Sequence, residues 1–91
     1  RLRLVASPDG RDGAVTIHAY ATLSAALLDG EERIQRALNP ERIAYVHLVR
    51  GALRVNDTPL QGGDALRLDR ETQLDLQGGK DAEVLVFDLA P

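Results

Sequence analysis

The segment "AYVHLVRGALRVNDTPLQGGDALRL", residues 44–68, decides most of what the sequence predicts about the fold. It contains a mostly apolar run, a glycine at position 51, a second run, the turn signal "NDTP" and the pair Gly62-Gly63. Short apolar runs separated by Gly, Asn, Asp and Pro are typical of β-strands joined by tight turns. We therefore expect a strand that ends at Gly51, a second strand, a turn, and a further strand that begins after Gly62-Gly63.

The same punctuation recurs along the rest of the chain, in "SPDGRDG", "LLDGEE", "LNPER" and "QGGKD". Between these clusters, "GAVTIHAYA" and "TQLDLQ" alternate apolar and polar residues, which is typical of half-buried strands. "EVLVFDL" is apolar on both faces and predicts a more deeply buried strand. The pattern predicts an all-β sandwich or small barrel with little or no helix, in which Gly62-Gly63 and Gly78-Gly79 are hairpin turns.

Residues 23–38, "LSAALLDGEERIQRAL", are the one segment that competes for a helix, because Ala, Leu and the Glu–Arg pairs favour helix formation. An interior Gly costs a helix about 1 kcal/mol relative to Ala, and Asp-Gly between two short runs is a strong hairpin signal. We therefore expect two strands joined by a turn at Asp29-Gly30, with a helix as the alternative.

The composition is that of one small folded domain: 91 residues, 44% hydrophobic, 27% charged and a net charge of -3. The eleven Lys and Arg residues are scattered, so nucleic-acid binding is not expected. No apolar run is long enough to span a membrane, and the chain has no Cys; both observations favour a cytoplasmic protein. Because the chain begins at Arg1 and contains no Met, we expect it to be a piece of a longer protein.

Residues 44–68 resemble the central hairpin of a cupin barrel. "RLRLVASPDGRDGAVTIH", "LLDGEE" and "DAEVLVFDL" resemble the C-terminal cupin domain of pirin-like proteins, the bicupin family that includes bacterial quercetin 2,3-dioxygenases. The resemblance covers essentially the whole chain. It implies a cupin fold, which is a double-stranded β-helix or jelly-roll-like small barrel. It also implies that residues 1–91 are a single degenerate, metal-free cupin domain, the C-terminal half of a bicupin protein.

In this family, a metal-binding cupin supplies its ligands from a His-x-His pair, a Glu a few positions later and a His in the second motif. Counting from the glycines of the two motifs places these ligand positions at Ala44 for the Glu, Leu74 for the second-motif His, and either Ala37 and Asn39 or Leu38 and Pro40 for the pair. The resemblance therefore implies that the metal site has been emptied and that the chain has no catalytic, cofactor-binding or metal-binding residues. A divalent, iron-type metal is expected only in the N-terminal cupin.

The two histidines of the chain cannot by themselves supply the three or more ligands of a catalytic metal site. Because side chains alternate along a strand, an inward Ala44 places the neighbouring His47 outward, where it is expected to be a structural or interface residue. The outward row is a candidate interface that must be covered by the domain's own second layer, by the N-terminal cupin of the same parent or by a second copy. Its members are Ile43, Tyr45, His47 and Val49.

Other candidate sites are better explained as ordinary structure. His18 is expected to be a partly solvated strand residue, and a Ser-His-Asp arrangement with Ser7 or Ser24 lacks a GxSxG elbow. The "SPDGRDG" loop lacks the ligand ladder of a calcium site. Glu31-Glu32 lie beside a turn, where water would solvate both carboxylates.

The expected function is that of a non-catalytic C-terminal cupin in a pirin-like protein, a structural partner of a metal-binding N-terminal cupin. The resemblance implies quercetin 2,3-dioxygenase-type activity, or a redox-responsive regulatory role, for the parent. The alternatives are a small-molecule or protein-binding cupin module, including one that self-associates, and an independent enzyme, which the missing ligand set disfavours. Side chains rather than a metal are expected to fill the barrel: Val15, Ile17, Val46, Leu48, Leu66, Leu68, Leu74 and Leu76.

Overall fold

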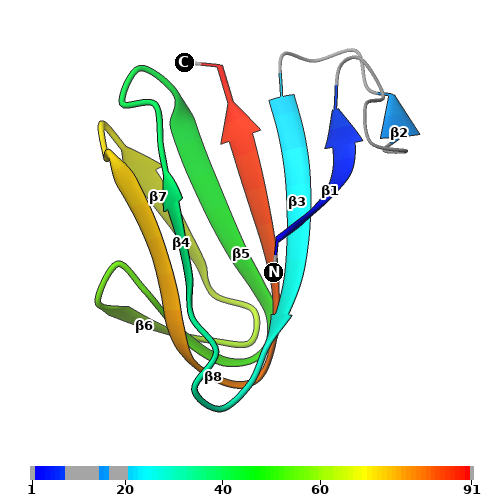
Figure 1. The fold of residues 1–91 in the computed structure, drawn as a ribbon, viewed down its shortest axis with the longest axis vertical. Coiled ribbons are helices and arrows are strands. Elements are labelled where there is room, and N and C mark those ends of the chain that lie inside the picture. The colour runs from blue at the N-terminus through cyan, green and yellow to red at the C-terminus, as the bar shows by residue number, and fades with distance from the viewer. Residues whose placement is uncertain (1, 8–14, 17–20, 91) are drawn as a thin grey trace.

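The computed structural model describes residues 2–7, 15–16 and 21–90. Within these ranges the chain forms strands and turns but no helix, so the all-β prediction is confirmed (Figure 1). A helix able to cross a membrane is therefore also absent from the described residues. The strands are β1 (Arg3–Ser7), β2 (Val15–Thr16), β3 (Ala21–Leu28), β4 (Ile34–Ala37), β5 (Ile43–Val55), β6 (Thr58–Gln61), β7 (Ala65–Asp69) and β8 (Gln73–Leu89).

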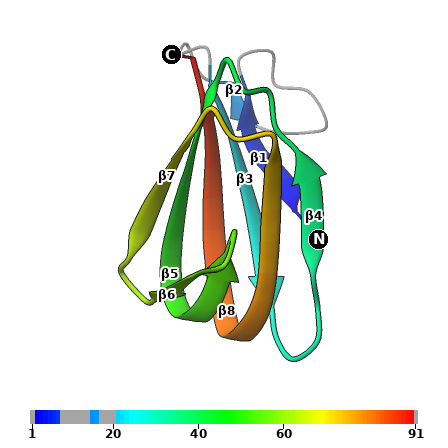
Figure 2. The same ribbon diagram turned by 90° about the vertical axis from the view of Figure 1, so that its left-hand side faces the viewer.

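The sheet folds over itself into two layers because β5 and β8, with 13 and 17 residues, each contribute to both (Figure 2). In the first layer, residues 82–89 of β8 lie between β3 and residues 43–48 of β5. β7 borders this part of β5, and β1 and β2 extend the layer beyond β3. In the second layer, residues 73–76 of β8 pair with β4, and the last residues of β5 pair with β6.

Glycines lie at the bends that carry β5 and β8 from one layer to the other. The β5–β8 ladder shifts register on both sides of Gly51, whose φ is +83°. A side chain at Gly51 would overlap the carbonyl oxygens of Lys80 and Asp81. The predictions that a strand ends at Gly51 and that Gly78-Gly79 form a hairpin turn are therefore wrong, because both sites lie within continuous, bent strands.

Two further predicted hairpins are turns between strands that do not pair with each other. A turn at Asp29-Gly30 joins β3 to β4, and the helical alternative is not adopted. However, β3 pairs with residues 82–89 of β8 whereas β4 pairs with residues 73–76. The turn at Gly62-Gly63 likewise joins β6 and β7, which pair with opposite ends of β5. The two turns are in the predicted places, but the strand pairing is different.

Asn56-Asp57 form a true two-residue hairpin turn between β5 and β6, with positive φ angles of 47° and 69°. The Asn56 side chain accepts a hydrogen bond from the Asp75 N–H at 2.7 Å and donates one to the Gln73 carbonyl at 2.8 Å. The Asn56 N–H also donates to the Asp75 carbonyl at 2.9 Å. This turn therefore fixes the end of β5 to the beginning of β8.

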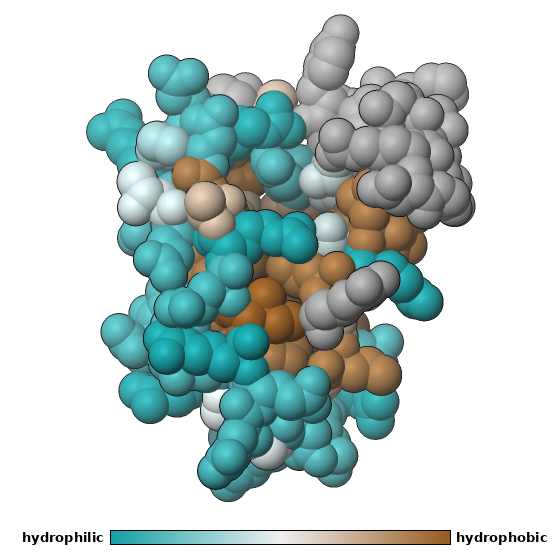
Figure 3. Space-filling model, in the orientation of Figure 1, coloured by the Kyte–Doolittle hydropathy of each residue, from teal (hydrophilic) through white to brown (hydrophobic). Residues whose placement is uncertain are grey.

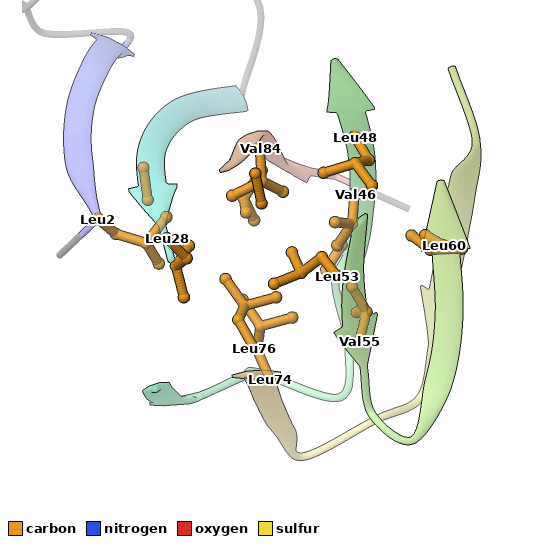
Figure 4. Packing of buried hydrophobic residues seen from close by; sticks show 14 of the residues in the cluster. Leu2, Leu28, Val46, Leu48, Leu53, Val55, Leu60, Leu74, Leu76 and Val84 are labelled. Atoms are coloured by element: carbon orange, nitrogen blue, oxygen red, sulfur yellow. The ribbon is translucent and has the colours of Figure 1, made fainter. Parts of the chain in front are cut away.

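Apolar side chains from both layers meet in one core (Figure 4). On the face shown in Figure 3, hydrophobic residues lie near the centre and hydrophilic residues lie to the left and below. Among the residues predicted to fill the barrel, Leu66 is half-buried against this core, and the Val15 side chain and all of Ile17 lie outside the described residues. The others are buried as predicted: Val46, Leu48, Leu68, Leu74 and Leu76. Burying a Leu or Val side chain contributes about 1.5–3 kcal/mol, so the packed interior is the main source of stability.

Replacing Gly51 with Ala is expected to lower the free energy of unfolding by more than about 3 kcal/mol, because the new Cβ overlaps two backbone carbonyl oxygens at a left-handed φ. Gly30→Ala is the control, since Gly30 has a φ of +63° and no atom within 4 Å of the added Cβ. It is expected to cost only about 1 kcal/mol. Urea unfolding of both variants measures the difference, and equal losses would contradict a steric requirement at the bend.

The ion pair between Arg33 and Asp75 fastens the segment before β4 to β8. Arg33 Nε lies 3.0 Å from Asp75 Oδ1, and Nη2 lies 2.8 Å from Oδ2. The hydrogen bond from Arg33 holds the pKa of Asp75 below its ordinary value, although desolvation acts in the opposite direction. A carboxyl group with a lowered pKa in the fold stabilises it above the unfolded-state pKa, and this contribution is lost as the pH falls through the folded-state pKa.

Asp75→Asn is therefore expected to lower the melting temperature at about pH 7, and this effect is expected to shrink as the pH falls through the folded-state pKa of Asp75. Thermal melts of both proteins at a series of decreasing pH values measure the difference. Glu71→Gln is the control, because Glu71 is exposed and makes no ion pair within the described residues. A destabilisation by Asp75→Asn that stayed constant down to low pH would contradict the charge-based explanation.

Candidate functional site

All but one of the positions at which the family resemblance implies lost metal ligands lie around one cavity. It lies at the end of the barrel where β5 begins and β8 ends, at the top of Figure 1, and has a volume of about 90 Å³. Ala44 of β5 and Leu74 of β8 are buried and form part of its wall. Pro40 lies outside the wall, but the other three implied positions line it: Ala37, Leu38 and Asn39.

This cavity does not fit a divalent metal. Ala and Leu side chains have no ligand atoms, so Asn39 supplies the one polar side chain among the implied ligand positions in the wall. A catalytic metal needs at least three N or O ligands around one point. No group of three or more His, Asp or Glu residues close enough to hold a metal occurs in the described ranges, and His18 lies outside them.

Polar side chains from other segments also line the cavity. Thr22 and Ser24 contribute hydroxyl groups from β3, and Arg36 comes from β4. The Arg42 guanidinium donates from Nε to Asp88 Oδ1 at 2.6 Å, which joins the segment before β5 to the end of β8. Sequence reasoning missed this group because its members come from separate segments, and Arg42 and Asp88 are 46 positions apart. The sequence offered one indication of these residues: because side chains alternate along a strand, Thr22 and Ser24 lie on the same strand face as the apolar residues Ala26 and Leu28.

The candidate interface row lies on the outer side of the first layer. His47 is half-buried and points away from the core, because its neighbours Val46 and Leu48 are fully buried. Tyr45 is 39% exposed and Val49 is 41% exposed. Alternate residues of β5 therefore serve the core and the outer surface.

Neighbouring strands extend this row into a larger apolar surface. Phe87 of β8 lies opposite Tyr45, with ring centroids 6.2 Å apart and an interplanar angle of 62°. Leu85 lies opposite His47, and Leu27 of β3 is 61% exposed. We define the outer face by these residues: Leu27, Ile43, Tyr45, His47, Val49, Leu85 and Phe87. No strand of the described chain lies over it in either ribbon view (Figures 1 and 2).

The other candidates from the sequence do not form a site in the described structure. Ser24 points into the barrel, and a nucleophilic arrangement would need His18, which lies outside the described residues. Glu31 and Glu32 are both exposed, and Glu32 accepts a hydrogen bond from the Asp29 N–H at 3.2 Å. The "SPDGRDG" loop lies almost entirely outside the described residues.

Comparisons with known proteins place the fold and the family. A family model described as "Quercetinase C-terminal cupin domain" matches residues 4–89. Quercetin 2,3-dioxygenase from Escherichia coli (strain K12) is 32% identical over 89 residues, which are 98% of this chain and 38% of that protein. The chain therefore spans well under half the length of this curated relative.

Solved structures agree with this result. The bacterial pirin YhhW from Escherichia coli, in complex with nickel(II), superimposes with a TM-score of 0.94 at 31% identity, over 100% of this chain and 40% of that one. Quercetin 2,3-dioxygenase from Acinetobacter baumannii gives a TM-score of 0.79 at 22% identity, over 99% of this chain and 32% of that one, and shows similarity of fold alone. The expected cupin architecture is confirmed, and the chain belongs to the family of quercetinase C-terminal cupin domains found in pirin-like proteins.

Proposed function

We propose that this chain is the non-catalytic C-terminal cupin domain of a bicupin protein whose N-terminal cupin holds a divalent, iron-type metal and carries quercetin 2,3-dioxygenase-type activity. The observation that carries the proposal is the chemistry of the cavity wall. Ala44 and Leu74 stand at the ligand positions implied by the family, and neither side chain can coordinate a metal. The metal and the oxidation chemistry are therefore assigned to a different domain.

The comparisons support this division of roles. The curated relative named quercetin 2,3-dioxygenase is longer, with most of its length beyond the matched region. Nickel(II) is present in the crystal structure of the longer pirin YhhW, of which this chain covers 40%.

The outer face is the surface proposed to contact the N-terminal cupin. Its aromatic pair, Tyr45 and Phe87, is flanked by aliphatic side chains and by His47, and apolar patches of this kind are typical of protein interfaces. A contact between the outer face and the N-terminal cupin of the same parent protein shields the apolar side chains from water. A second copy of the chain is the alternative occupant.

The purified chain, expressed without a His-tag in medium supplied with iron, manganese, nickel and copper, is expected to contain far less than one metal ion per folded chain. The reason is that the described residues contain no group of three or more His, Asp or Glu side chains that could hold a metal. Elemental analysis measures the content, and YhhW prepared in the same way is the positive control. A content close to one metal per chain, or quercetin turnover by this chain alone that a chelator abolishes, would contradict the proposal.

Hydroxyl-radical footprinting is expected to label Tyr45 readily in the isolated chain and several-fold more slowly in the full-length parent protein, because an interface there excludes solvent. Pro59 is the internal control, since it is exposed on β6 in the second layer and its labelling should stay unchanged. Equal labelling of Tyr45 in both proteins would contradict an interdomain contact at the outer face. Protection that appears in the isolated chain as its concentration rises would instead assign the face to a second copy.

A further inference from the structure

We infer that the cavity at the end of the barrel is a binding site for a short-chain monocarboxylate, held by Arg36 and the Ser24 hydroxyl. This site lies on the inner side of the first layer, shares only Ile43 with the outer face, and does not depend on the proposed activity of the parent. The inference rests on three properties of the wall, which are a buried hydroxyl aimed inward, two cationic side chains, and an apolar floor.

Ser24 is the polar residue buried most deeply at this site, with only 6% of its surface exposed. It shares the inward phase of β3 with the buried Ala26 and Leu28, so its side chain points into the barrel. Its side chain makes no hydrogen bond to any described residue. Every fully enclosed side-chain N or O atom of the described residues has a hydrogen-bond partner, so the Ser24 hydroxyl oxygen is not fully enclosed. The hydroxyl therefore keeps access to the cavity, where a ligand oxygen can bond to it.

The charged groups of the wall favour an anion. The wall contains two cationic side chains, Arg36 and Arg42, and one carboxylate, Asp88, on a chain whose net charge is -3. Arg42 is engaged by Asp88 through the 2.6 Å bond and by a second, 3.4 Å bond from Nη2 to the Asp88 carbonyl. Arg36 lies opposite Leu74 in the β4–β8 ladder, so both side chains project from the same face of the sheet toward the cavity.

Arg36 is the group best placed to supply charge to a ligand. Its side chain is exposed and forms none of the ion pairs seen among the described residues. A guanidinium group binds a carboxylate through two parallel N–H···O bonds, and these charge-assisted bonds are stronger than neutral ones. A carboxylate at the mouth can therefore bond to Arg36 on one side and accept a hydrogen bond from Ser24 on the other.

The apolar floor and the volume of the cavity determine what the remainder of the ligand can be. Ala44, Leu74 and Val86 form the buried apolar floor, which fits a hydrocarbon group rather than a sugar or a phosphate. The 90 Å³ cavity is smaller than the roughly 150 Å³ cavity that accommodates benzene. A carboxylate with a short alkyl chain, such as butanoate, therefore matches the site better than an aromatic acid.

The test is a titration of the isotopically labelled chain with sodium butanoate, followed by amide chemical shifts in NMR spectra. Saturable shifts are expected around residues 24, 44 and 74, and 1-butanol, which lacks the charge, is expected to bind at least about tenfold more weakly. Inorganic phosphate at the same ionic strength is expected to cause no saturable shift at these residues. Absence of saturation with butanoate, or equal binding of butanol or phosphate, would overturn the inference.

Two variants test whether butanoate binds at Arg36 and Ser24, and a third tests whether loss of a positive charge outside the cavity has the same effect. Arg36→Gln removes the cation at an exposed position and is expected to weaken butanoate binding at least about tenfold. Ser24→Val removes the hydroxyl, adds volume inside the cavity and is expected to abolish binding. Arg54→Gln, at an exposed position of β5 outside the cavity wall, is expected to leave the affinity unchanged. Unchanged affinity in Arg36→Gln, or an equal loss in Arg54→Gln, would contradict a specific site.

Discussion

The pairing between β5 and β8 is the interaction on which the rest of the structure depends. β3, β4, β6 and β7 each pair with one of these two strands, so the positions of both layers follow from this ladder. The ladder can serve two layers only if both strands bend. Backbone atoms approach so closely at the bends that a Cβ at Gly51 would overlap two carbonyl oxygens, and one at Gly79 would lie 2.8 Å from the Leu28 carbonyl oxygen. Two small residues therefore allow the sheet to close around its core.

Because the sheet closes on itself, successive residues of one strand point alternately into the barrel and to its outer surface. In β5 and β8, Ala44 and Val86 point inward to the cavity, whereas Tyr45 and Phe87 point to the outer face. The inward side contains small and aliphatic residues where the family resemblance implies metal ligands, so the fold is held by apolar packing. Burial of these apolar side chains stabilises the described fold, which is consistent with the structural role proposed for the domain.

The composition of the site could be predicted only in part from the sequence. Counting from the motif glycines identified Ala44 and Leu74, which lie together in the cavity wall although 30 positions separate them, and which lack ligand atoms. The polar wall was not predicted, because Ser24, Arg36 and Asp88 belong to three different strands. No local pattern marks residues that meet only when β3, β4 and β8 are assembled. The sequence indicated only that Ser24 shares a strand face with the apolar residues Ala26 and Leu28.

The sequence by itself determined the all-β class, several of the turns and part of the set of side chains that point inward, because φ preferences and period-2 alternation depend on residues close together in the chain. It thus predicted the turns at Asp29-Gly30 and Gly62-Gly63 and the burial of Val46 and Leu48. Only the tertiary structure decided which strands pair, why Gly51 continues a strand, and which charges meet at the cavity. These features depend on contacts between distant segments, and the energy of such contacts is gained only after the two long strands have bent and closed the barrel.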